Sequence, residues 1–171
     1  MTKNIRLIRV EGKNAYVPLN QGYEAIIDSE DAHLVGRWNW YALIGKSTVY
    51  AFRSETHGGN GKQKSFYMHR AIMGDPKGLD VDHINSHGLD NQKSNLRLAS
   101  HAENMRNAKI SRLNTSGFKG VHWLKSAGKW QARIRTDSGR KHLGLFADAQ
   151  DAYSAYCSAA EFYHGKFARL K

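Results

Sequence analysis

One stretch of the sequence, residues 79–107, restricts the fold more than any other part of the chain. It reads LDVDHINSHGLDNQKSNLRLASHAENMRN. Residues 79–83 are expected to form a short strand that ends in an acid and an imidazole, and 95–99 a second short strand. The residues between them, 84–94, are rich in Asn, Ser, Gly and Asp and are typical of a loop. The stretch therefore predicts a hairpin with a long connection.

A helix is expected directly after this hairpin. Ser100 and Glu103 have the spacing of a capping box, in which each side chain satisfies a backbone N–H group of the other residue. The helix should run to about residue 109. The elements then follow one another as strand, loop, strand and helix. Asn104 lies one turn into this helix, and it faces the hairpin if the helix packs across it.

The polar residues of this stretch suit phosphodiester hydrolysis. That reaction needs a base to activate water and a cation to stabilise the charge on phosphate and on the leaving oxygen. His83 is a residue type that titrates near neutral pH, and its neighbour Asp82 offers the oxygen ligands that magnesium prefers. Asn104 can offer a neutral oxygen to the same ion. Asn95 can hydrogen-bond backbone groups across the loop and hold His83 in one orientation.

This constellation resembles the HNH nuclease family, the ββα-metal endonucleases. Asn95 lies twelve positions after His83, and Asn104 lies nine positions after Asn95, as in that family. The third letter of the motif is Asn, as in phage and intron homing endonucleases. The resemblance implies that His83 is the general base, Asn95 an orienting residue, and Asp82 and Asn104 the ligands of one Mg²⁺ or Mn²⁺ ion. A histidine-rich transition-metal site is not expected.

Neighbouring residues receive smaller roles. His69 and Arg70 resemble the His-Arg pair that precedes the motif in these enzymes, and Arg70 and Arg97 are expected to contact DNA. Asp90 and Asn91 are expected to stabilise the loop by local side-chain to backbone bonds.

The region before the motif reads as short strands with aromatic core residues. Trp38, Trp40, Tyr41 and Tyr50 are expected in the core. The glycine-containing segment 55–64 is expected to be a loop. Expected elements are strands at 14–18, 23–27, 38–43, 48–53 and 65–69, a helix over 30–36, and a helical turn at 70–73.

The end of the chain predicts a three-stranded antiparallel sheet packed on one helix. Strands are expected at 119–125, 129–136 and 140–146, and Asp148 is placed to cap a helix that runs to about residue 164. The second strand alternates, with Lys129 and other polar residues on one face and apolar residues on the other. One face of the sheet is then covered by the alanine-rich helix, and the other is a positive surface about as wide as a DNA major groove.

This segment resembles the plant Apetala2/ethylene-response-factor DNA-binding domain over most of residues 116–169. The resemblance rests on the stretches GFKGV, GKWQARIR and LGLF and on the Ala/Tyr helix that ends in GKFA. It implies that the sheet enters the major groove, although His122 and Arg133 depart from the family's usual Arg and Glu. A sheet that contacts only phosphates is the alternative. The expected DNA contacts are Lys119, His122, Lys129, Arg133, Arg135, Arg140 and His142.

Charge supports a nucleic-acid partner. The chain has 171 residues and a formal net charge of +11. Residues 111–171 carry 11 basic and 4 acidic side chains, whereas residues 1–110 carry 15 and 11. A basic excess of this density is typical of a DNA-binding face. The expected domains are 1–110 for the nuclease, with its core at 79–109, then a linker at 111–116 and a DNA-binding domain at 117–171.

Several classes of protein are excluded by composition. No apolar run is long enough to cross a membrane, and the basic first ten residues lack the apolar core of a signal peptide. The single cysteine, Cys157, excludes an internal disulfide framework and indicates an intracellular compartment. No protein partner is implied.

Together these features predict an α+β protein with two modules. A small N-terminal β region leads into a ββα-metal nuclease, and a sheet-plus-helix domain follows. The expected function is a site-directed endonuclease for double-stranded DNA, of the mobile-element homing type. Two alternatives remain open: a sequence-specific DNA-binding regulator with an inactive nuclease module, and a structure-selective repair or recombination nuclease.

Overall fold

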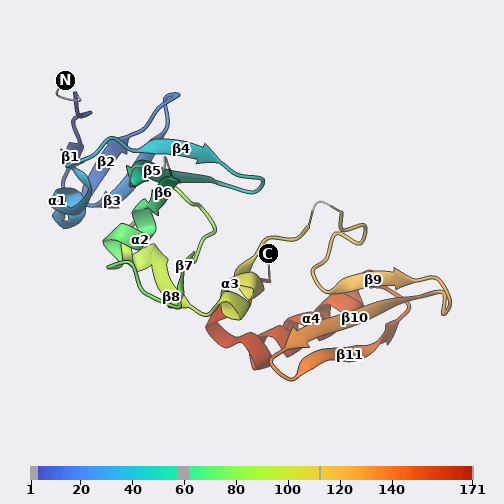
Figure 1. The fold of residues 1–171 in the computed structure, drawn as a ribbon. Coiled ribbons are helices and arrows are strands. Elements are labelled where there is room, and N and C mark those ends of the chain that lie inside the picture. Colours follow the sequence, from blue (N-terminus) through green and yellow to red (C-terminus); the bar gives the residue numbers. More distant parts are fainter. Residues whose placement is uncertain (1–3, 58–61, 112, 171) are drawn as a thin grey trace. The chain divides into compact units, whose positions relative to one another are not determined.

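The computed structural model describes residues 4–57, 62–111 and 113–170 of the chain. Two compact units make up the fold, Met1–His101 and Ala102–Lys171. Their division falls before the polar segment at 111–116 that the sequence suggested as a linker. Antiparallel strands and helices occur in both units (Figure 1), so the expected α+β class is confirmed.

The first unit begins with a three-stranded antiparallel sheet in the order β1-β2-β3. A 3-10 turn and a short helix follow where the sequence predicted one helix. The elements are β1 (Arg9–Glu11), β2 (Asn14–Pro18), β3 (Glu24–Asp28), the 3-10 helix η1 (Ser29–Asp31) and α1 (Ala32–Val35).

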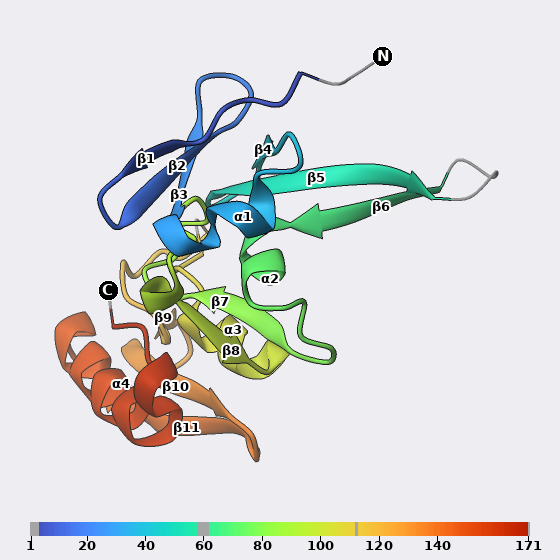
Figure 2. The same ribbon diagram turned by 90° about the vertical axis from the view of Figure 1, so that its left-hand side faces the viewer.

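A second antiparallel sheet, in the order β4-β5-β6, includes the longest hairpin of the unit (Figure 2). Its elements are β4 (Tyr41–Ile44), β5 (Val49–His57) and β6 (Lys62–Tyr67), and α2 (Met68–Ile72) follows β6 directly.

Three predictions for this sheet are wrong. The strand expected to begin at residue 38 begins at Tyr41. The loop expected over 55–64 is instead an extension of both strands as far as His57 and Lys62, and only 58–61 lie outside the described residues. Cross-strand pairing of Glu55 with Lys64 places opposite charges side by side, which favours the longer hairpin. The strand expected to end at residue 69 ends at Tyr67.

The predicted hairpin and helix follow in the expected order. β7 (Asp80–His83) pairs with β8 (Leu96–Ala99), and α3 (His101–Asn107) follows Ser100 and ends two residues earlier than expected. The long connection contains a 3-10 turn, η2 (Lys93–Asn95). From Ala102 onward, α3 belongs to the second compact unit.

One apolar core holds the first unit together. Trp40 is 1% exposed, and its Nε1 donates to the carbonyl oxygen of Val35 at 3.0 Å, so the expected core role is confirmed for this tryptophan. The same expectation is wrong for Trp38 and Tyr41, which are both 39% exposed. Other members of the core come from strands, helices and the long connection alike: Ala15, Val17, Ala25, Ile27, Ala51, Met68, Ile72, Val81, Leu89 and Leu96.

The second unit contains the three-stranded antiparallel sheet that the sequence predicts, in the order β11-β10-β9. A long helix packs on one of its faces, and the side chain of Asp148 caps that helix by accepting from Gln150 N at 2.6 Å. The elements are β9 (Val121–Leu124), β10 (Lys129–Thr136), β11 (Gly139–Phe146), α4 (Ala149–His164) and η3 (Gly165–Phe167).

The helix sits close to the sheet because small residues lie between them. Ala132 of β10 packs with Ala152 of α4, and Ile134 packs with Tyr156. Gly120, which has a φ of +75°, precedes β9 where a Cβ atom would lie 2.1 Å from the Tyr156 ring. A side chain at position 120 would therefore push Tyr156 out of the core. Within the described residues, no helix combines the length and apolar character needed to span a bilayer.

Candidate active site

The candidate general base, His83, lies at the end of β7 and is 5% exposed. Its Nε2 lies 3.1 Å from Oδ1 of Asn91, and the Nδ2 of Asn91 lies 3.2 Å from the carbonyl oxygen of Leu89. Because the Leu89 carbonyl can only accept, the asparagine nitrogen points to it and the asparagine oxygen faces the histidine. The neutral imidazole therefore carries its proton on Nε2 and its lone pair on Nδ1.

Asn91 is held by a strand from the other end of the unit. Its backbone N–H donates to the carbonyl oxygen of Ile26 at 2.7 Å, and the N–H of Ile26 donates to Leu89 at 2.8 Å. Ile26 of β3 and Asp90 thus form a parallel bridge that pins the connection between β7 and β8. Asn91 is fully buried. The N-terminal sheet therefore fixes the residue that orients the imidazole.

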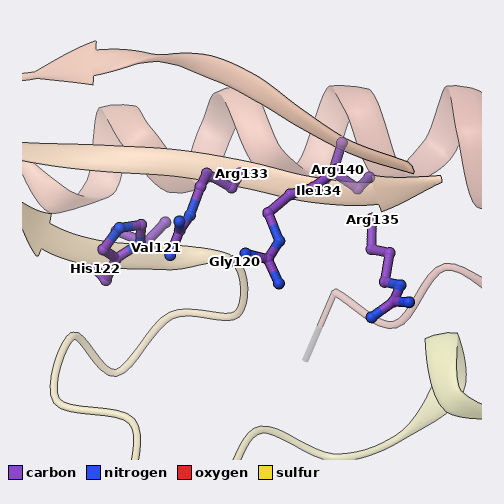
Figure 3. A pocket seen from close by; sticks show the side chains of 7 residues that line it. All are labelled: Gly120, Val121, His122, Arg133, Ile134, Arg135 and Arg140. Carbon is purple, nitrogen blue, oxygen red and sulfur yellow. The ribbon is translucent and has the colours of Figure 1, made fainter. Parts of the chain in front are cut away.

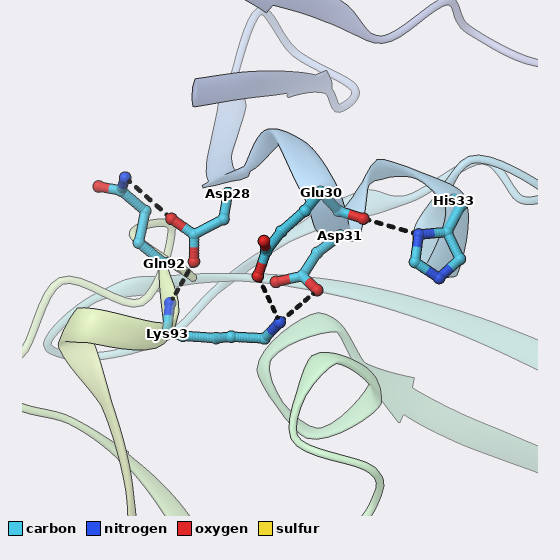
Figure 4. Close-up of polar contacts among 6 residues, drawn as sticks. All are labelled: Asp28, Glu30, Asp31, His33, Gln92 and Lys93. Atoms are coloured by element: carbon cyan, nitrogen blue, oxygen red, sulfur yellow. Dashed lines mark hydrogen bonds and ion pairs between the residues drawn. The ribbon is translucent and has the colours of Figure 1, made fainter. Parts of the chain in front are cut away.

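Polar contacts reinforce the same junction (Figure 4). The Nζ of Lys93 lies 2.7 Å from Oδ1 of the buried Asp31 and 3.0 Å from Oε1 of Glu30. The backbone N–H of Lys93 donates to the carboxylate of Asp28, and Gln92 donates to the other oxygen of that carboxylate. Because Asp28 ends β3 and Asp31 belongs to η1, these bonds tie the connection between β7 and β8 to the N-terminal part of the unit.

Asn95 spans the loop, as the sequence predicts, through backbone groups. Its Oδ1 accepts from the N–H of Asn85 at 3.0 Å, and its Nδ2 donates to the carbonyl oxygen of Asp90 at 2.8 Å. Asp90 also makes a local bond, accepting from the Asn85 side chain at 2.7 Å. Asn95 thus sets the shape of the loop, whereas the direct contact to His83 that the structure gives comes from Asn91.

Asp82 lies opposite Arg97 in the β7–β8 register. The Nε and Nη2 atoms of Arg97 both donate to Oδ2 of Asp82, at 2.8 and 2.7 Å. The two side chains are only 6% and 13% exposed. Asp82 is therefore a buried carboxylate that already faces a cation.

Aromatic rings form a wall around the candidate base. The His69 ring meets the His83 ring edge to face, with centroids 4.9 Å apart, and Tyr50 lies 5.8 and 5.9 Å from the two histidines. Tyr67 lies 5.5 Å from His69. Gly88 allows this packing, because a Cβ atom there would lie 2.7 Å from the Tyr50 ring.

Burial in this wall acts on the protonation of both histidines. It lowers the pKa of His69 to about 3, with repulsion from His83 as a smaller cause. Burial also lowers the pKa of His83, although the bond to Asn91 and the charge of Asp82 oppose it. Both rings are therefore neutral near pH 7, the state that a general base needs.

The donor set at Asp82 suits a hard divalent ion. Carboxylate and amide oxygens are the ligands that Mg²⁺ prefers, although the buried carboxylate of Asp82 is already paired with Arg97. Across the described residues, no group of three or more His, Cys, Asp or Glu side chains is arranged to hold a metal. Asn104 is half-buried on α3 in the second unit. Its part in metal binding stays a prediction.

Three predicted DNA contacts are engaged inside the protein. Arg97 pairs with Asp82, and Arg70 donates to Asp75 and to the carbonyl oxygens of Pro76 and Leu79. The Nζ of Lys119 donates to the carbonyl oxygens of Arg106 and Ala108 at 2.6 and 2.8 Å, at the end of α3. The geometry thus gives Arg70 and Lys119 structural roles.

The remaining predicted contacts lie on the sheet of the second unit. Because Ala132 and Ile134 face α4, the alternate residues Arg133 and Arg135 of β10 face the other way. A hollow on this sheet is lined by His122, Arg133, Arg135 and Arg140, together with Gly120, Val121 and Ile134 (Figure 3). Lys129 is exposed. His142, also exposed, lies with its Nδ1 2.9 Å from the amide nitrogen of Gln131.

Comparison with known proteins shows which class of protein contains a hairpin and a histidine of this kind. A family model described as HNH endonuclease matches residues 74–106, which contain β7, the long connection, β8 and most of α3. The matched segment includes His83, Asn91, Asn95 and Asn104. An HNH endonuclease module is therefore present, and it indicates action on DNA.

The chain is also similar to a phage protein over a longer stretch of sequence. Protein 3.8 of Escherichia phage T7 is 35% identical to the chain over 96 residues, which is 56% of this chain and 78% of the phage protein. The chain therefore belongs to the same family as this phage protein. No solved structure matches it.

Two residues of the site could not be placed from the sequence. Asn91 reaches His83 only because β3 pins the connection, and His69 reaches it only because α2 turns the chain after β6. The match to the His-Arg pair of related enzymes was a signal for His69. For Asn91 the only signal was an asparagine within the loop.

Proposed function

We propose that the chain is a DNA endonuclease that hydrolyses phosphodiester bonds with His83 as general base and one divalent ion, Mg²⁺ or Mn²⁺. The observation that carries this proposal is the hydrogen bond between His83 Nε2 and Asn91 Oδ1. It places the imidazole lone pair on Nδ1, in a ring that burial keeps neutral. A neutral, fixed imidazole beside a carboxylate is the arrangement that water activation requires.

In the proposed reaction the Nδ1 of His83 takes a proton from the attacking water. Asn91 accepts a hydrogen bond from Nε2–H throughout, so it steadies the imidazolium that forms. Asp82 and Asn104 would hold the ion, which supplies positive charge for the phosphate and the leaving oxygen. Asn95 keeps the loop in the shape that presents Asn91 and His83 together.

We propose that the second unit places the enzyme on DNA, as an Apetala2/ethylene-response-factor-like module. Support comes from its sheet, whose side opposite α4 carries Arg133 and Arg135, with Arg140 at the same hollow. Residues 111–171 also carry 11 basic against 4 acidic side chains. Directed cutting by such a pair of modules fits a homing endonuclease of a mobile element.

Mapping of cut ends tests this proposal. The purified chain, Mg²⁺ and the DNA of a candidate phage and host should give cleavage at one or a few sites, and removal of Mg²⁺ with EDTA should abolish it. Cutting that follows branches or nicks regardless of sequence would point to a structure-selective nuclease. Sequence-specific binding without any cutting would point to a regulator and contradict the proposal.

A further inference from the structure

The ion pair between Asp82 and Arg97 is placed where a metal ligand is proposed. Both residues belong to the β7–β8 hairpin and face each other in its register. Two N–H groups of the guanidinium converge on one oxygen, Oδ2, at 2.8 and 2.7 Å. With side chains 6% and 13% exposed, the pair is shielded from water, so its electrostatic effect is strong.

This pairing has an energetic consequence for metal binding. A divalent ion at Asp82 would share the carboxylate with a guanidinium, and the two positive charges would repel each other. Buried ion pairs in general add little net stability compared with well-packed apolar residues of similar volume. The arrangement therefore opposes metal binding as long as Arg97 stays on Asp82.

We propose that Arg97 is a positioning residue that holds Asp82 in the metal-free protein and transfers to a DNA phosphate when substrate binds, so that the divalent ion binds tightly only together with DNA. This inference rests on the proposed function. It makes Arg97 the link between DNA binding and metal binding in one site.

The chemistry of arginine supports the transfer. A guanidinium binds phosphate and carboxylate with the same fork of N–H donors, so a phosphate oxygen can replace Oδ2 of Asp82. Arg97 is the more exposed member of the pair, at 13% against 6% for Asp82, so an incoming phosphate meets Arg97 before it meets Asp82. A substrate phosphate has to come beside Asp82 if that residue holds the catalytic ion.

Calorimetric titration of Mn²⁺ tests the inference without measuring cleavage. The variants are Arg97→Gln, Arg97→Lys and Asp82→Asn, with Arg9→Gln as a control that removes the same charge from the Arg9–Glu24 pair on β1 and β3. Without DNA, Arg97→Gln should bind Mn²⁺ about tenfold more tightly than wild type, the scale of effects beside a metal ligand. Arg97→Lys and Arg9→Gln should match wild type, and Asp82→Asn should bind Mn²⁺ at least about tenfold more weakly.

The same titration with DNA measures the coupling. In a His83→Ala background, which slows cutting, a mixed-sequence duplex should tighten Mn²⁺ binding about tenfold, and Mn²⁺ should tighten duplex binding by the same factor. Adding Arg97→Gln should remove this coupling. Because the coupling is measured first with Arg97 intact, the test stands even if Arg97→Gln does not fold.

Three results would overturn the inference. The first is Mn²⁺ binding that Asp82→Asn weakens but that DNA does not change. The second is a folded Arg97→Gln protein, checked by circular dichroism, that binds Mn²⁺ no more tightly than wild type. Neither of these two results contradicts the proposed nuclease function. The third, Mn²⁺ binding that Asp82→Asn does not alter, overturns the proposed metal site as well.

Discussion

The Nε2 atom of His83 lies 3.1 Å from Oδ1 of Asn91, a residue eight positions further along the chain. The contact exists because β3, more than 50 residues earlier, bonds to the connection on both sides of Asp90. The N-terminal sheet is therefore part of the catalytic apparatus that we propose. It sets which nitrogen of His83 can take a proton.

Replacement of Asn91 by alanine should impair both stability and cleavage. The change leaves a buried N–H group of His83 without its partner, at a cost of about 1–3 kcal/mol in the free energy of unfolding. Urea unfolding followed by tryptophan fluorescence measures that loss. Plasmid nicking should fall while duplex binding persists, since Asn91 is fully buried and cannot touch DNA. Unchanged nicking would show that the contact does not orient the base.

His69 should make the first unit sensitive to acid. Its pKa is about 3 in the folded protein, against an ordinary 6.5, so the unfolded chain binds more protons between these values. The free energy of unfolding should therefore fall as the pH drops from 6.5 towards 3. Phenylalanine keeps the ring contact to His83 but cannot titrate.

Urea titrations across this pH range compare wild type with His69→Phe. The stability of the variant relative to wild type should rise steadily as the pH falls. Parallel curves for the two proteins would show that the buried imidazole does not contribute to acid unfolding. Circular dichroism at pH 7 checks that both proteins share one fold.

Metal dependence should identify the two proposed ligands. Asp82→Ala and Asn104→Ala each remove one of two protein oxygens, so each should shift the Mg²⁺ requirement for plasmid cleavage upward by about 10–100-fold. Activity titrated against Mg²⁺ concentration measures the shift. A variant with a wild-type Mg²⁺ requirement would remove that residue from the proposed site.

Basic residues of the second unit should divide into those that contact DNA, such as Arg135, and those that stabilise the fold. Arg135→Ala should weaken DNA binding, by about 1–3 kcal/mol at a single base position if the arginine reads a base edge. If it contacts phosphate, the salt slope should fall by about one for all sequences. Fluorescence anisotropy at several salt concentrations separates these outcomes, and binding equal to wild type would exclude Arg135 from the interface.

Lys119 should stabilise the second unit and make no contact with DNA. Because its ammonium donates to two carbonyl oxygens at the end of α3, Lys119→Gln should destabilise the second unit by about 1–3 kcal/mol. It should leave the salt slope of DNA binding unchanged, as measured by the same anisotropy titrations at a temperature where the variant is folded. A slope reduced by about one would return Lys119 to the DNA interface.

Local patterns in the sequence predicted the elements of the site but not its long-range contacts. The alternation of β10 and the Ser100–Glu103 spacing act within a few residues, and the sheet and the helix start that they indicate are confirmed. Local patterns do not predict where a long side chain points. The side chain of Lys119, for example, bends back to carbonyl oxygens more than ten residues earlier. Asn91 likewise depends on a bridge to β3 that no local pattern carries.

Plasmid cleavage by the His83→Ala variant tests the central claim most directly. Supercoiled plasmid is incubated with wild type or variant in Mg²⁺, and the nicked and linear forms are quantified over time. The account predicts Mg²⁺-dependent cutting by wild type and a rate lower by about 10²–10⁴-fold in the variant, with duplex binding unchanged. A variant that cuts at the wild-type rate, or a wild type that does not cut in Mg²⁺ or Mn²⁺, would contradict it.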